Sequence, residues 1–60
     1  MQPPDTIYEI RAHDDSGEWW AVDYQLSPLH AKHALRVLAK RTPVLTGWVI
    51  AQRKVQPVWN

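Results

Sequence analysis

The chain has 60 residues, with seven lysines and arginines, six acidic residues, three histidines and no cysteine. This length allows one domain at most, and the lack of cysteine excludes disulfides and thiolate metal sites. No apolar run is long enough to span a membrane, and the N-terminus lacks the basic start and apolar stretch of a signal peptide, so a cytoplasmic protein is expected.

Charge is sorted by position along the chain. Residues 1–31 hold all six acids and one base, which gives −5, and residues 32–60 hold six bases and no acid, which gives +6. Such asymmetry favours an acidic partner for the second half, self-association, or contact between the two halves.

A β-hairpin is predicted after an extended leader at residues 1–5. Residues 6–13 alternate in polarity, with Tyr8, Ile10 and Ala12 on one face, and residues 18–26 alternate in the same way. The intervening Asp-Asp-Ser-Gly cluster is typical of a hairpin turn, because Gly17 tolerates the left-handed backbone conformation.

A helix is predicted from Pro28 to Arg41. Ser27 is a good N-cap, Pro28 suits the first helical position, and Thr42-Pro43 ends the pattern. One face carries the apolar stripe, and the opposite face carries the basic one. The apolar stripe is Ala31, Ala34, Leu35 and Leu38, and the basic face is Lys32, His33, Arg36 and Lys40.

A third strand is predicted over residues 44–55, with an interruption at Thr46-Gly47. The result is a single α+β domain at residues 6–60 in the order β-β-α-β, with one helix on one face of a three-stranded sheet. The predicted core is Tyr8, Ile10, Trp20, Val22, Leu35, Leu38, Trp48 and Ile50.

The other sheet face has no predicted cover and is a candidate contact surface. It should hold Ile7, Glu9, Arg11 and His13, then Trp19, Ala21, Asp23 and Gln25, then Val49, Ala51, Arg53 and Val55. The residues expected to meet a partner there are Arg11, Trp19, Val49 and Arg53. Four tryptophans exceed what so small a core readily encloses, so at least one is expected to be partly exposed.

The alternative surface is the basic helix face, which with the third strand would suit the phosphates of a nucleic acid. The near-neutral total charge argues against that reading. His30 and His33 lack an evident third ligand for a metal, so neither a metal nor a cofactor is expected. Ser16 and Ser27 serve a turn and a cap, which leaves no predicted nucleophile, and an enzyme is not expected.

The strand from Glu18 to Val22, the Ala-Leu-Arg helix and the strand ending Arg53-Lys54-Val55 resemble short β-β-α-β proteins of bacteriophages and GC-rich actinobacteria. The resemblance implies a small accessory protein that binds a host protein, in the host cytoplasm if phage-encoded, and transfers no site. The sequence thus predicts a non-enzymatic protein-interaction module, self-associating or binding a host protein, with nucleic-acid binding as the alternative.

Overall fold

The computed structural model describes residues 6–54 and confirms the predicted α+β fold in the order β-β-α-β. Its elements are β1 (Thr6–His13), β2 (Trp19–Gln25), α1 (Pro28–Arg41) and β3 (Thr46–Lys54). The helix has the predicted bounds, whereas the third strand starts later than predicted because Pro43 and Val44 form a turn. The predicted leader at residues 1–5 and strand residue Val55 lie outside the described residues.

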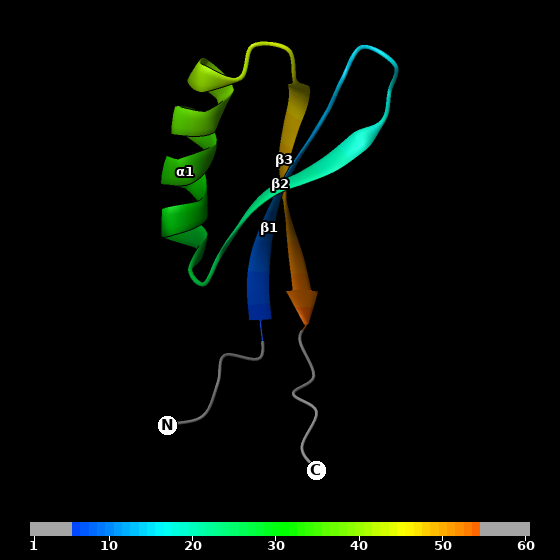
Figure 1. Ribbon diagram of the computed structural model, residues 1–60. Coiled ribbons are helices and arrows are strands. Elements are labelled where there is room, and N and C mark those ends of the chain that lie inside the picture. The colour runs from blue at the N-terminus through cyan, green and yellow to red at the C-terminus, as the bar shows by residue number, and fades with distance from the viewer. Residues whose placement is uncertain (1–5, 55–60) are drawn as a thin grey trace.

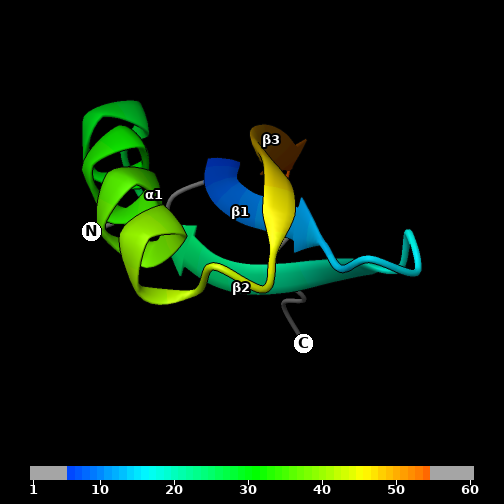
Figure 2. The same cartoon turned by 90° about the horizontal axis from the view of Figure 1, so that it is seen from above.

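The three strands form one antiparallel sheet in the order β2-β1-β3, with β1 in the centre. Helix α1 contacts all three strands and runs beside the sheet (Figure 1). Seen from above, the turn between β1 and β2 projects away from α1 to the opposite side of the molecule (Figure 2). The acidic hairpin turn and the basic helix therefore lie far apart, and the two charged segments do not fold onto each other.

Helix α1 begins and ends where the sequence places its caps. The Ser27 hydroxyl accepts a hydrogen bond of 3.1 Å from the backbone N–H of His30, and Pro28 follows it. At the other end, the backbone N–H of Thr42 donates to the carbonyl of Leu38 at 2.9 Å. Lys40 and Arg41 occupy the last turn, where positive charge is favourable next to the helix dipole.

The core between helix and sheet is small. Ile10 and Ala12 of β1 and Ala31 of α1 are fully buried. Burial of Ile10 confirms one core prediction, but six further predicted core residues are only half-buried; these are Tyr8, Val22, Leu35, Leu38, Trp48 and Ile50. Trp20 was wrongly placed in the core, because it lies near the hairpin turn and leaves 48% of its surface exposed.

A β-bulge in β2 changes which side chains share a sheet face. Ile10 pairs with Asp23 while the next residue, Arg11, pairs with Ala21, so Val22 is the extra residue. Strand β2 therefore switches faces at Val22, and Glu9 pairs with Tyr24. Tyr24 consequently lies on the face that α1 leaves open. The prediction that Asp23 and Gln25 lie there was wrong, because the bulge moves them to the helix side.

The hairpin turn is organised around the Asp14 carboxylate. This carboxylate accepts hydrogen bonds from the hydroxyl and backbone N–H of Ser16, the latter at 2.9 Å, and from the backbone N–H of Glu18 at 3.2 Å. It also accepts one of 3.2 Å from the Trp20 indole Nε1, which explains how Trp20 is held without being buried. These hydrogen bonds lower the pKa of Asp14 below its ordinary value, and the bond from the Ser16 side chain has the largest effect.

Candidate functional site on the open sheet face

The sheet face opposite α1 is not covered by any other element formed within residues 6–54, and it is called the open face below. Its members follow from the strand pairing, since directly paired residues of antiparallel strands point to the same side. They are Ile7, Glu9, Arg11 and His13 from β1, Trp19, Ala21 and Tyr24 from β2, and Thr46, Val49, Ala51 and Arg53 from β3.

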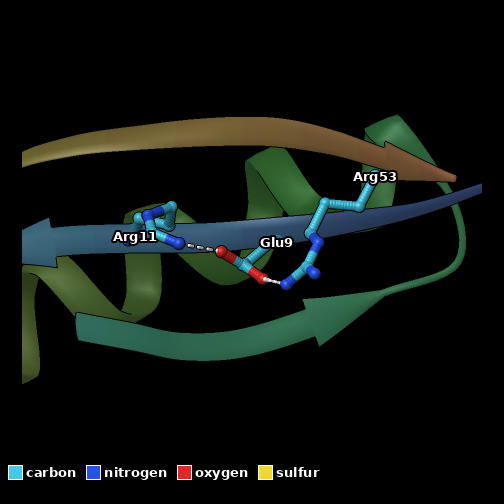
Figure 3. A network of polar contacts seen from close by, with 3 residues as sticks. All are labelled: Glu9, Arg11 and Arg53. Atoms are coloured by element: carbon cyan, nitrogen blue, oxygen red, sulfur yellow. Dashed lines mark hydrogen bonds and ion pairs between the residues drawn. The ribbon is translucent and has the colours of Figure 1, made fainter. Parts of the chain in front are cut away.

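A carboxylate held by two guanidinium groups occupies the middle of this face. Arg11 donates from Nη1 to Glu9 Oε1, and Arg53 donates from Nη1 to Glu9 Oε2 at 2.9 Å (Figure 3). Figure 3 shows the three side chains in front of the sheet, with α1 behind it. Because Arg53 comes from β3, this contact also joins the acidic first half of the chain to the basic second half.

Glu9 leaves only 1% of its surface exposed although it lies on the uncovered face. Both of its carboxylate oxygens have a charged donor, so the cost of removing it from water is offset. The hydrogen bond from Arg53, followed by that from Arg11, holds the pKa of Glu9 below its ordinary value of 4.5, against the opposing effect of burial. In return, Glu9 raises the pKa of Arg53. The Glu9 carboxylate is thus ionised at neutral pH.

Aromatic and aliphatic side chains flank the charged group. Trp19, Tyr24 and Val49 expose 45%, 49% and 44% of their surfaces respectively. The Trp19 ring meets the His13 ring edge-on, with ring centroids 4.8 Å apart and planes at 69°. The open face therefore combines exposed apolar surface with a preformed ionic centre.

Glycine at position 47 makes room for His13. Gly47 has φ +68°, in the left-handed region, at a register shift between β1 and β3. A Cβ atom there would lie 2.4 Å from His13 Nε2 and 2.5 Å from its Cδ2, closer than real contacts allow. His13 is held from the other side, where its Nδ1 lies 3.0 Å from the backbone carbonyl of Asp14. The position of the His13–Trp19 pair thus depends on a residue without a side chain.

The second predicted surface, the basic face of α1, lies apart from the open face. Its residues Lys32, His33, Arg36 and Lys40 are all exposed. Among residues 6–54, the ion pairs are those of Glu9, so none of the basic side chains of α1 has an acidic partner there. A shallow groove of about 360 Å³ runs along this face, lined by Leu29, His30, Lys32, His33 and Arg36.

The structure places on the same sheet face all four residues predicted to meet a partner there, namely Arg11, Trp19, Val49 and Arg53. Sequence reasoning placed Glu9 on this face but gave it no role, and it put Tyr24 on the wrong face. A signal for Glu9 was present, because an arginine two residues later in the same strand points to the same side. No comparable signal revealed the bulge that turns Tyr24 outward.

Comparisons of the chain with protein-family models, with curated proteins and with solved structures find no match. No helix within the described residues is long and apolar enough to cross a membrane. Over the same residues, no three histidine, aspartate or glutamate side chains gather into a group that could hold a metal ion, so His30 and His33 have no third ligand there.

Proposed function

We propose that this chain is a non-enzymatic protein-interaction module that docks a polypeptide partner on its open face. The observation that carries the proposal is that the exposed side chains of Trp19, Tyr24 and Val49 share one sheet face with the Arg11–Glu9–Arg53 group. Tryptophan, tyrosine and arginine are the residues that most often dominate binding energy at protein interfaces. Here they lie on one rigid, hydrogen-bonded sheet rather than on loops, which reduces the entropy lost on binding.

The spacing of the aromatic rings supports a protein over a single-stranded nucleic acid on this face. Trp19 and Tyr24 pair with His13 and Glu9, which are four residues apart on β1, and this corresponds to about 13 Å at roughly 3.3 Å per strand residue. Single-stranded nucleic acids stack successive bases on closely placed aromatic rings, and two rings this far apart do not serve neighbouring bases.

Nucleic-acid binding remains a second candidate for a different surface, the basic face of α1. The observation that favours it is the absence, within the described part of the chain, of any acidic partner for Lys32, Arg36 and Lys40. Their spacing of four residues places them about 6 Å apart along the helix, in a row. Such a row of basic side chains also suits an acidic protein surface. It therefore supports nucleic-acid binding less specifically than the open face supports docking of a polypeptide.

Affinity capture with matched variants tests the open face. The tagged chain is incubated with lysate of the cells that produce it, treated with nuclease, and compared with Val49→Glu and Val44→Glu. Both valines are exposed, but Val44 lies in the turn before β3, away from the open face. We expect a partner identified by mass spectrometry to be retained by the wild type and Val44→Glu and lost with Val49→Glu.

A partner lost equally with both substitutions, or with neither, would contradict docking on the open face. Nucleic acid recovered only without nuclease treatment, and lost when Lys32, Arg36 and Lys40 are changed to glutamine, would support the second candidate instead. Self-association through the open face stays a prediction, and recovery of untagged copies of this chain in the same experiment checks it.

A further inference from the structure

The ionic centre of the open face has unused binding capacity. Each guanidinium donates through one nitrogen, Nη1, to Glu9, and an arginine side chain carries several further N–H donors. Both arginines keep part of their side chains exposed, 36% for Arg11 and 60% for Arg53, whereas the Glu9 side chain leaves only 1% of its surface exposed. The groups that face a partner here are therefore donors.

The same group carries a net positive charge. Two guanidinium groups surround one carboxylate whose pKa is lowered, which leaves one positive charge in excess. The neighbouring residues Ala21, Tyr24, Val49 and Ala51 supply no acidic group to balance it. Covering this centre with an uncharged surface would bury that charge without a partner, which is costly.

From this arrangement we infer that the partner contributes a carboxylate, from an aspartate or glutamate flanked by apolar residues, that accepts hydrogen bonds from the free N–H groups of Arg11 and Arg53. The inference rests on the proposed function and specifies its partner. Glu9 holds the two guanidinium groups in place before binding, so little side-chain entropy remains to be lost when the carboxylate arrives. The flanking apolar residues of the partner cover Trp19 and Val49.

A second copy of this chain fits the open face poorly. Two open faces brought together would place two uncompensated positive charges in one interface, which disfavours a symmetric dimer. The acidic hairpin turn of another copy offers Asp15 and Glu18, but with apolar residues on one side only, since Ser16 and Gly17 precede Glu18, and Trp19 and Trp20 follow it. The charge of the open face therefore favours a different polypeptide.

Peptide selection on the purified full-length chain tests the inference. Random dodecapeptides displayed on phage are selected on the wild type, with Val49→Glu as the counter-selection target. We expect enrichment of peptides with one acidic residue between apolar residues. The best peptide and its counterpart with glutamine in place of the acid are then synthesised, and their dissociation constants are measured by fluorescence anisotropy.

The acidic peptide is expected to bind the wild type at least about tenfold more tightly than its glutamine counterpart. This preference should disappear with Arg53→Gln and persist with Arg36→Gln, a matched loss of an exposed arginine on α1. Circular dichroism verifies that each variant is folded. Arg53→Lys keeps the charge beside Glu9 but loses the planar fork, so it should fold and reduce the preference.

The outcomes separate the inference from the proposed function. One contrary outcome is a peptide that fails to bind the Val49→Glu variant yet binds the wild type equally well when glutamine replaces its acidic residue. Such a peptide would overturn the inferred carboxylate contact and leave the docking surface intact. An acid preference that survives both Arg53→Gln and Arg53→Lys, or that is lost with Arg36→Gln, would also overturn the inference. A selection that yields no peptide sensitive to Val49→Glu would contradict the docking surface itself.

Discussion

Replacing Gly47 with alanine should destabilise the protein far more than the same change at Gly17. Both glycines have positive φ, +68° and +84°, so alanine at either position incurs the left-handed backbone cost of about 1–2 kcal/mol. At Gly17 nothing lies within 4 Å of the added Cβ, and the cost ends there. At Gly47 the added Cβ would overlap the His13 ring at 2.4 Å, and the ring must move.

The extra cost at Gly47 follows from what His13 loses when it moves. Its hydrogen bond to the Asp14 carbonyl is worth about 0.5–1.5 kcal/mol, and its edge-on contact with Trp19 about 0.5–1.5 kcal/mol. Together with the backbone cost, Gly47→Ala should lower the free energy of unfolding by about 2–5 kcal/mol. A domain of 60 residues has only about 3–9 kcal/mol in total, so this variant should be close to unfolding.

Urea denaturation followed by circular dichroism measures both substitutions. A second pair of variants isolates the contribution of the His13 ring. When Gly47→Ala is introduced into His13→Ala, the free energy of unfolding should fall only by the backbone cost, about 1–2 kcal/mol. Equal losses for Gly17→Ala and Gly47→Ala, or an unchanged loss in the His13→Ala background, would refute the role assigned to Gly47.

Three further predictions follow from the core, the ionic centre and the basic helix. Ile10→Ala should lower the free energy of unfolding by about 2–5 kcal/mol, measured by the same denaturation, since this side chain is fully buried. Glu9 has a lowered pKa, so the stability it contributes is present above about pH 4.5 and is lost as the pH falls through its folded-state pKa. Glu9→Gln should therefore weaken the dependence of the melting temperature on pH below 4.5. An unchanged pH dependence in that range would contradict the pairing of Glu9 with the two arginines. If α1 binds DNA or RNA, changing Lys32, Arg36 and Lys40 to glutamine should reduce the log–log salt slope by about 0.7–0.9 for each lost phosphate contact, and an unchanged slope in filter binding would exclude contacts from these residues.

The local patterns predicted the elements well because each one is decided by neighbouring residues. Ser27 and Pro28 define the start of α1, and alternation in residues 6–13 defines β1 and its two faces. The basic face of α1 follows from the same helical spacing. These features depend on short-range geometry, so the sequence contains enough information to place them.

The errors arise where a tertiary contact decides the outcome. The bulge at Val22 exchanges the faces of Asp23 and Tyr24, and simple alternation along β2 does not contain it. Trp20 was expected in the core because of its size, yet its indole bonds to Asp14 at the hairpin turn and stays exposed. The burial of Glu9 depends on Arg53, 44 residues away, a pairing that becomes visible only once β3 lies beside β1.

Site-specific photo-crosslinking in the cells that produce this chain tests docking on the open face most directly. A photoreactive amino acid is placed at position 49 on the open face or at position 44 in the turn before β3, and adducts are identified by mass spectrometry. Docking on the open face predicts a discrete adduct with another polypeptide from position 49 and none from position 44. Adducts from position 44 alone, or the same products from both positions, would contradict it.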